Sequence, residues 1–225
     1  MKPLANILLL SALALWLAAC GGASVDVTSD APYPASQADV PSIAPRWQGR
    51  YLATNDTSQA LLLQAQLLVQ QSWRSWTFTR QALDSLGVPR QPGARYWRGQ
   101  RYRVQALPSD SLRLSWQEQD TLWQAGARQP ARLRYYRGSY YLSVPSLAQP
   151  DHWQVQRLVA TGPQLTWQTL LPDTLRFRAL DAGAVALQRT PSQVQLTLHL
   201  PARRAQRQLS QYAGLWQPLG QYQRQ

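Results

Sequence analysis

Residues 194–200 read Val194-Gln195-Leu196-Thr197-Leu198-His199-Leu200, with apolar and polar side chains in strict alternation. Successive side chains of a β-strand point to opposite faces of a sheet, so this stretch predicts a strand with one buried and one polar face. The same alternation recurs at 102–106, 112–117, 153–156 and 174–178. Turn signals rich in Pro, Gly, Ser and Asp separate these runs, at 108–111, 161–164, 172–173 and 181–183. Short strands with frequent turns predict an all-β fold, mainly antiparallel.

Two segments have the features of short helices. The segment 79–86 is followed by Gly87, and the segment 202–212 is closed by Gly214. A glycine just after the last turn is typical of a helix end. The run 61–71 is ambiguous, because its Leu, Ala and Gln content favours a helix whereas its alternation favours a strand. We interpret it as a strand.

The strand pattern contains an internal duplication. Residues 104–107 and 114–117 match residues 155–158 and 165–168 in one register, and Arg95-Tyr96-Trp97-Arg98-Gly99 echoes Arg134-Tyr135-Tyr136-Arg137-Gly138. The repeat covers about 95–125 and 134–178. Each copy predicts a four-stranded meander: an aromatic strand, an Arg-Gly turn, a strand, a Trp-containing strand, an Asp turn and a last strand. Trp116 and Trp167 are expected at equivalent places in the core.

A solenoid or propeller needs at least three good copies to bury a continuous core. The two copies therefore predict a single antiparallel sheet curled into a barrel or half-barrel, with the four-strand units as its walls. A trefoil-like or propeller-like arrangement is the alternative.

The first residues have the pattern of an export signal. Lys2 is the only lysine of the chain, and the residues from Leu4 to Ala19 are apolar or small apart from Asn6 and Ser11. A short positive start followed by an apolar run is typical of a secretory signal peptide. The run is short for a helix that crosses a bilayer, which needs roughly 20 apolar residues.

The end of this run, Leu17-Ala18-Ala19-Cys20-Gly21, resembles the lipobox of bacterial lipoproteins. The resemblance implies that residues 1–19 are a lipoprotein signal peptide, cleaved before a Cys20 that carries a thioether-linked lipid and usually an acylated amine. Two or more acyl chains hold a protein stably at a membrane. In that family a residue other than Asp after the cysteine, here Gly21, goes with the outer membrane. A plain signal peptide that happens to end in a cysteine is the alternative.

Residues 21–45 are rich in Pro, Ser, Ala and Gly. Such a composition favours disorder, because it offers little apolar surface to bury. We therefore expect residues 20–45 to be an acylated cysteine and a disordered tether, with a mean reach of roughly 25–30 Å for about 25 flexible residues. The folded part is then 46–225, a size that one domain fills. Cys20 is the only cysteine, which excludes an intramolecular disulfide.

The segment 46–225 holds all 22 arginines and eight acidic residues, for a formal charge of +14. A basic face beside a membrane would attract anionic lipid headgroups or phosphorylated glycolipid. A genome-wide codon bias is the alternative, since Glu118 is the only Glu and no lysine follows Lys2. Export separates the protein from nucleic acid, which we exclude as a partner.

Few residues have the chemistry of catalysis. The only histidines are His152 and His199, and no local cluster of metal-ligating residues accompanies them, so we predict no metal, no cofactor and no enzymatic activity. Five aspartates fall at predicted turns, where Asp is favoured for its backbone hydrogen bonds: Asp110, Asp120, Asp151, Asp173 and Asp181. A hydrolase acting through these aspartates is the weaker alternative.

Aromatic residues and arginines recur together at the starts of the two repeats. Aromatic faces stack on sugar rings or apolar ligands, and arginine binds carboxylate or phosphate. We hypothesise a ligand cleft lined by Trp97, Arg98, Tyr135, Tyr136 and Arg137. The alternative is that the aromatics are ordinary strand residues and the arginines ordinary surface residues.

The start of the folded part, Trp47-Gln48-Gly49-Arg50-Tyr51, is faintly similar to the first strand of lipocalin-like lipoproteins. That family has the order Gly-x-Trp, which is reversed here, so no binding residues carry over. Half-barrel carriers of lipoproteins resemble the expected fold in general shape. The sequence thus predicts an envelope lipoprotein that binds an apolar or anionic ligand, a glycan or an envelope protein; a structural or assembly subunit is the alternative.

Overall fold

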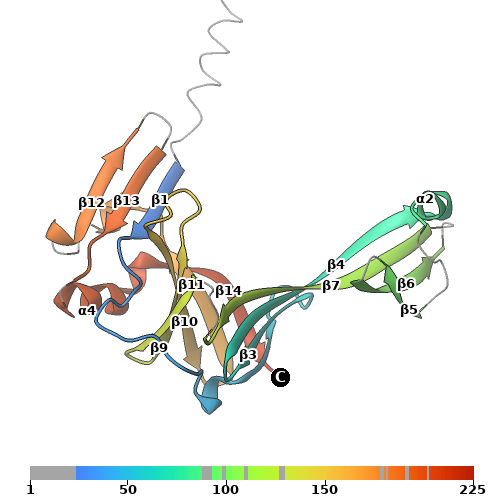
Figure 1. The fold of residues 1–225 in the computed structure, drawn as a ribbon, viewed down its shortest axis with the longest axis horizontal. Coiled ribbons are helices and arrows are strands. Elements are labelled where there is room, and N and C mark those ends of the chain that lie inside the picture. The colour runs from blue at the N-terminus through green and yellow to red at the C-terminus, as the bar shows by residue number, and fades with distance from the viewer. Residues whose placement is uncertain are drawn as a thin grey trace, which may run out of the picture. The chain divides into compact units, whose positions relative to one another are not determined.

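The computed structural model describes residues 24–87, 93–97, 100–108, 111–126, 130–177, 180, 182–190, 193–201 and 203–225. The predicted signal peptide and Cys20 lie outside the described residues. The chain is mostly β, as the alternation predicts. Figure 1 shows the strands with short helices between them.

Fourteen strands are present in the described residues: β1 (Ser24–Ser29), β2 (Gly49–Ala53), β3 (Gln59–Gln64), β4 (Leu67–Thr79), β5 (Gly93–Trp97), β6 (Gln100–Leu107), β7 (Ser111–Gln124), β8 (Arg132–Tyr136), β9 (Ser139–Pro145), β10 (Trp153–Thr161), β11 (Gln164–Leu170), β12 (Val185–Arg189), β13 (Gln193–Leu198) and β14 (Trp216–Arg224). The α-helices of this described part are α2 (Arg80–Ser85), α3 (Thr174–Phe177) and α4 (Arg203–Gln211). Short 3₁₀ turns are η1 (Pro45–Trp47), η2 (Ala182–Ala184) and η3 (Ala213–Leu215).

The strands form one open sheet. Its hydrogen-bonded order is β12-β13-β1-β10-β11-β14-β2-β3-β4-β7-β6-β5, with β8 paired to β9 and β9 to β10. The sheet does not close on itself among the described strands, because β12 and β5 stand at the two ends of this order. The predicted all-β, sheet-dominated class is confirmed. One exception to the antiparallel pattern is β1, which runs parallel to β13.

The chain divides into two compact units, each built from three separate segments. Unit 1 comprises Met1–Gln37, Ser143–Val155 and Thr169–Gln217, and unit 2 comprises Ala38–Leu142, Gln156–Gln168 and Pro218–Gln225. Residues before position 46 therefore belong to both folded units.

Unit 2 contains the longest strand pair. β4 and β7 are antiparallel over thirteen residue pairs, from Leu67 opposite Gln124 to Thr79 opposite Ser111. β3 flanks β4 only as far as Ser72, and β6 flanks β7 only as far as Trp116. At one end of the pair the sheet therefore continues beside β4 into β3, and at the other end it continues beside β7 into β6.

Both predicted helices are present. Thr79 caps α2, since its hydroxyl accepts a 3.2 Å hydrogen bond from the N–H of Ala82, and Gly87 follows with φ +65°. The helix covers the end of the β4–β7 pair, where Leu83 is buried in an apolar cluster. We call this the distal cluster: Leu83, Tyr102, Val104, Leu112 and Leu114. The second predicted helix is α4.

Two predicted strands differ from the structure. The run 61–71 is not one strand, because Ala65 and Gln66 form a tight turn between β3 and β4. The run 174–178 is not a strand either, because its described part is α3. The Asp173 carboxylate accepts a 3.0 Å hydrogen bond from the N–H of Leu175 and so favours a helical start.

The two copies of the predicted repeat differ in the structure, because β9 follows the aromatic strand β8 before the matched strand β10 in the second copy, whereas β5 is followed by the matched strand β6 in the first. The aromatic strands are β5 and β8, and the matched stretches fall in the β6–β7 and β10–β11 pairs. The fourth predicted strand is continuous with the third in the first copy, where β7 runs through Asp120, and is replaced by α3 in the second. Trp167 is 6% exposed whereas Trp116 is half-buried, so the two are not equivalent.

The disordered tether predicted over residues 20–45 is wrong for its described part. β1 starts at Ser24 and pairs with β13 over six residues. The side chains of Tyr33 and Ile43 are each 1% exposed. Composition favoured disorder, but two large side chains and backbone pairing supply enough burial to order the segment.

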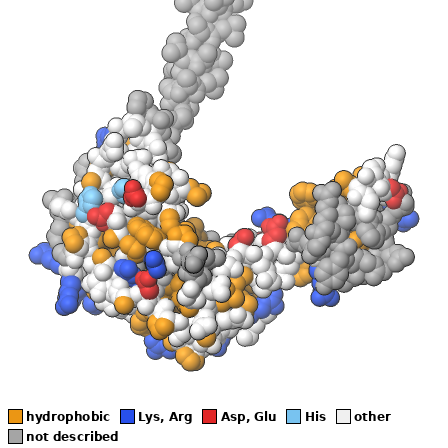
Figure 2. Space-filling view, viewed as in Figure 1, with side chains coloured by type: hydrophobic (Ala, Val, Ile, Leu, Met, Phe, Trp, Pro, Cys, Tyr) orange, Lys and Arg blue, Asp and Glu red, His pale blue; other side chains and the backbone are white. Residues whose placement is uncertain are grey.

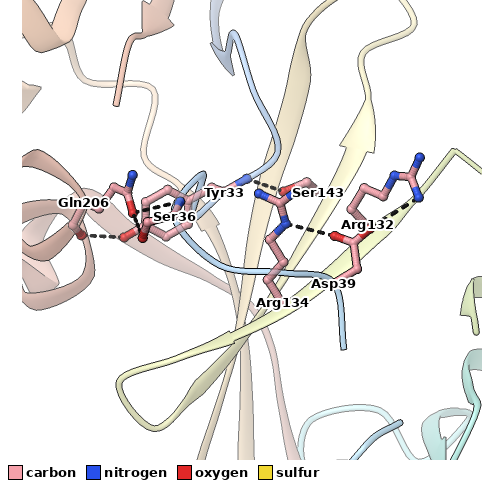
Figure 3. Close-up of polar contacts among 7 residues, drawn as sticks. All are labelled: Tyr33, Ser36, Asp39, Arg132, Arg134, Ser143 and Gln206. Carbon is pink, nitrogen blue, oxygen red and sulfur yellow. Dashed lines mark hydrogen bonds and ion pairs between the residues drawn. The ribbon is translucent and has the colours of Figure 1, made fainter. Parts of the chain in front are cut away.

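Polar contacts hold the same segment in each unit (Figure 3). In unit 1 the backbone N–H of Tyr33 donates to Ser143 Oγ at 2.9 Å, and its hydroxyl donates to the carbonyl of Gln206 at 2.6 Å. In unit 2 the carboxylate of Asp39 pairs with Arg134 at 2.9 Å and with Arg132 at 3.3 Å.

The β8–β9 hairpin turns at Arg137 and Gly138, as the Arg-Gly signal predicts. Both residues have positive φ, +49° and +82°, the pattern of a two-residue type I′ turn. Arginine in this left-handed conformation is strained, since a Cβ there costs roughly 1–2 kcal/mol.

We expect Gly138→Ala to lower the free energy of unfolding by about 1–2 kcal/mol, because it places a second Cβ in the left-handed region. Arg137→Asn is expected to raise it by a few tenths to about 1 kcal/mol, because asparagine tolerates that region. Gly183→Ala is the control, since Gly183 has no positive φ and open space around its Cα. Urea unfolding of the three variants measures the differences; an equal effect of both alanine changes would contradict the turn assignment.

Candidate functional site

The aromatic residues around the predicted cleft pack against one another in unit 2. The ring centroid of Tyr140 lies 5.0 Å from that of Trp47 and 4.9 Å from that of Tyr135. The Tyr140 hydroxyl accepts a 2.7 Å hydrogen bond from the N–H of Ala44, and the Tyr135 hydroxyl accepts one of 2.8 Å from Arg46. These contacts fix the segment before β2 against the β8–β9 hairpin, so the aromatic faces are used for packing.

The predicted cleft residues are distributed over two hairpins. Tyr135 belongs to the aromatic packing just described, Tyr136 is half-buried, and Arg137 is exposed at the turn. Trp97 ends β5, but its side chain and Arg98 lie outside the described residues. β5 pairs with β6 and β8 with β9, so no pairing among the described strands joins the two halves. A shared cleft stays a prediction.

A different site is built by the alternation of β6 and β7. On one face of these strands Tyr102, Val104, Leu112 and Leu114 are buried in the distal cluster. The intervening residues of the opposite face are polar: Arg103 and Gln105 on β6, Arg113 and Ser115 on β7, and Ser75 on β4. Register places Arg103 opposite Ser115, and Gln105 opposite Arg113.

This polar face borders a hollow of about 560 Å³, which we call the basic groove. Its lining residues are Ser58, Trp73, Arg74, Ser75, Arg103, Val104, Gln105, Arg113 and Ser115. The groove lies where β3 stops flanking β4 and β6 begins to flank β7, at the pair Trp73–Gln117. The change of flanking strand leaves the space that these side chains line.

The arginines of the groove differ in their charge partners. Arg74 forms a 3.0 Å ion pair with Glu118, and its hydrogen bond is the main reason that the pKa of Glu118 is lowered. The guanidinium of Arg103 lies 5.3 Å from the ring centroid of Trp73, a cation–π contact. Among the described residues neither Arg103 nor Arg113 has a carboxylate within ion-pair distance. Within the described residues, Arg103 and Arg113 therefore give the groove positive charge that no carboxylate compensates.

Arginine is not gathered into one patch on the face shown in Figure 2, where blue side chains are scattered among neutral ones. The groove differs from these scattered arginines, because it combines two guanidiniums that have no described carboxylate partner with an indole, hydroxyls and an amide in one hollow. Guanidinium forks and hydroxyl donors together bind phosphate or carboxylate.

The predicted turn aspartates have mixed outcomes. Asp151 lies in a turn and Asp173 caps α3, whereas Asp120 lies within β7 opposite Gln70, so its turn assignment is wrong. Asp110 and Asp181 lie outside the described residues.

His199 follows β13 and its Nδ1 lies 2.6 Å from an oxygen of Asp30. Within the described ranges, no three His, Cys, Asp or Glu side chains are placed to hold a metal ion.

No family model, curated protein or solved structure matches this chain. None of the helices in the described part of the chain is both long and apolar enough to span a membrane.

Part of the groove could have been predicted from the alternation of the strands. The runs 102–106 and 112–117 alternate, so Arg103 and Arg113 could be assigned to polar faces. What alternation alone does not predict is that Trp73, some 30 residues earlier in the chain, joins them through the β4–β7 register.

Burial favours the neutral form of four tyrosine side chains in unit 2. Burial is the main cause that raises the pKa of Tyr51, Tyr140, Tyr141 and Tyr222 above the ordinary 10.0. At pH values above 10 the unfolded chain therefore loses these protons before the folded chain does.

We expect the free energy of unfolding to be constant with respect to these groups below pH 10 and to fall as pH rises above it. Each tyrosine contributes a slope of at most about 1.4 kcal/mol per pH unit. Tyr222→Phe is expected to make the fall shallower, because burial alone raises the pKa of that residue. Urea unfolding at a series of alkaline pH values measures the slope, with Tyr212→Phe on unit 1 as control. An unchanged slope in Tyr222→Phe would contradict the assignment.

Proposed function

We propose that the protein is a bacterial envelope lipoprotein, anchored through acylated Cys20, whose folded part binds an anionic envelope ligand in the basic groove without catalysing a reaction. The lipobox-like residues 17–21 support the anchor. The observation that carries the ligand is the pair of guanidiniums of Arg103 and Arg113, which share one hollow with Trp73 and have no described carboxylate partner.

The volume and lining of the groove support a particular class of ligand. Small-molecule sites occupy about 300–1,000 Å³, a range that includes the 560 Å³ of this groove. Ser75, Ser115 and Gln105 add hydrogen-bonding groups around the two arginines. This set suits a sugar or headgroup that carries phosphate or carboxylate, with hydroxyls to bond the neutral side chains.

Docking to another envelope protein is a second candidate function, favoured by one side chain. Trp76 lies on β4 beyond the last residue paired with β3, and its side chain is 62% exposed. An exposed tryptophan on a strand edge suits a protein partner. Trp76→Ala would abolish such docking and leave binding in the groove unchanged.

The anchor is tested by Cys20→Ser in cells fed labelled palmitate. We expect the variant to lose the label and to leave the membrane fraction, because no thiol remains for acylation. Gly22→Ser is the matched control and is expected to keep the label. Gly21→Asp is expected to move the labelled protein from the outer to the inner membrane fraction. Unchanged labelling and fractionation of Cys20→Ser would refute the anchor.

Ligand binding is tested by calorimetric titration with glucose 1-phosphate and with neutral glucose. We expect wild type to bind the phosphorylated sugar in preference, and Arg103→Gln with Arg113→Gln to weaken that binding at least about tenfold. A hydrogen bond to a charged group contributes roughly 1.5–3 kcal/mol.

Arg203→Gln with Arg207→Gln removes the same charge from α4 and is expected to bind as wild type. Equal losses in the two double variants would assign binding to net charge and contradict the groove. Binding should also weaken as salt concentration rises, since exposed charges are screened.

A further inference from the structure

The connection between the predicted anchor, Cys20, and the folded part is much shorter than the tether expected from the sequence. The described chain enters β1 at Ser24, so at most residues 21–23 separate Cys20 from the sheet. A fully extended chain spans at most about 3.6 Å per residue, so the four steps from Cys20 to Ser24 cover no more than about 14 Å. A tether that continued to residue 45 would have reached much farther.

The start of β1 is firmly part of unit 1. β1 pairs in parallel with β13 from Ser24 opposite Gln193 to Ser29 opposite Leu198. β13 in turn pairs with β12, where Arg189 lies opposite Val194. Arg189, Thr190 and Gln193 therefore lie at the same end of this sheet as Ser24. We call this the anchor end.

The opposite end of the same strands is occupied by α4. After β1, the N–H of Asp30 donates to the carbonyl of Leu198 at 3.2 Å, and Tyr33 then bonds the carbonyl of Gln206 in α4. Figure 1 shows α4 below β1 and β13, on the side to which their arrows point. A six-residue strand is about 20 Å long, so the two ends of β1 are well separated relative to the length of the connection.

We propose that the anchor end of unit 1 lies against the surface of the bilayer, and that the three-residue connection to acylated Cys20 holds it there. The inference rests on the proposed acylation of Cys20. The partner is the headgroup layer of the membrane, which is several ångströms deep on each side of the hydrocarbon core. Arg189 is exposed at this end and adds attraction to anionic headgroups.

The chain is suited to a direct test, because Cys20 is its only cysteine. In the acylated protein a newly introduced cysteine is therefore the only free thiol. Arg189→Cys places a bimane label at the anchor end, and Arg203→Cys places one at the start of α4. Both changes remove one exposed arginine, so their effects on charge are matched.

Each labelled, acylated protein is reconstituted in vesicles of phosphatidylethanolamine and phosphatidylglycerol containing a small fraction of lipid with a nitroxide on its headgroup. We expect the label at position 189 to be quenched several-fold more than the label at 203. Inserting a Gly/Ser segment of about 20 residues between Gly22 and Ala23 is expected to abolish the difference, since its mean reach is roughly 25 Å.

Equal quenching at the two positions with the native connection would overturn the proposal, as would a difference that persists in the lengthened variant. In both cases flotation of the protein with the vesicles would leave the anchor itself intact. Failure of the native protein to acquire lipid or to float would instead refute the proposed function. Circular dichroism of each variant establishes that the sheet is folded.

Discussion

β4 and β7 pair along their whole lengths, and most of the chemistry of unit 2 follows from the register of that pairing. Side chains alternate between the faces of a strand, so a slip of one residue would move every side chain to the other face. The observed register sets Ser75 opposite Ser115 and Trp76 opposite Leu114. It thereby directs one set of residues to the basic groove and the other to the distal cluster.

The same pairing gives the arginines of the groove neighbours that isolated surface arginines lack. Isolated surface arginines are solvated and carry little information about function. In the groove, Glu118 compensates Arg74, whereas the guanidinium of Arg103 is held over Trp73. Positive charge is thus concentrated beside an aromatic face and hydroxyl groups. The aromatic residues near β8 and β9 have a different role, since the ring of Tyr140 packs against those of Trp47 and Tyr135.

Local sequence signals predicted local structure well. Alternation identified β6 and β13, Thr79 and Gly87 marked the ends of α2, and the Arg137-Gly138 pair marked a hairpin turn. The failures came where side chains or distant segments decide the outcome. The capping carboxylate of Asp173 makes a helix from an alternating run, and the turn at residues 65–66 contains neither glycine nor proline.

The groove and the ordered N-terminal segment depend on contacts between residues far apart in the sequence. Arg103 and Arg113 could be assigned to a polar face from their own strands, but Trp73 joins them only through the β4–β7 register. Tyr33 looked like part of a polar, proline-rich tether, and its burial requires Ser143 and Gln206, more than a hundred residues away. The composition of a segment does not indicate which distant residues will contact it.

The pair Trp73–Gln117, where neither β3 nor β6 flanks the two strands, also separates two bodies of hydrophobic packing within unit 2. The five residues of the distal cluster lie on one side of it with α2, β5 and β6, and among the described strands this part is connected to the rest of the sheet only through β4 and β7. Such a part of a protein opens as its own cooperative element, at a lower free energy than global unfolding. Its backbone amides would exchange with deuterated solvent first, and proteases would cut the chain there before the rest of the molecule opens.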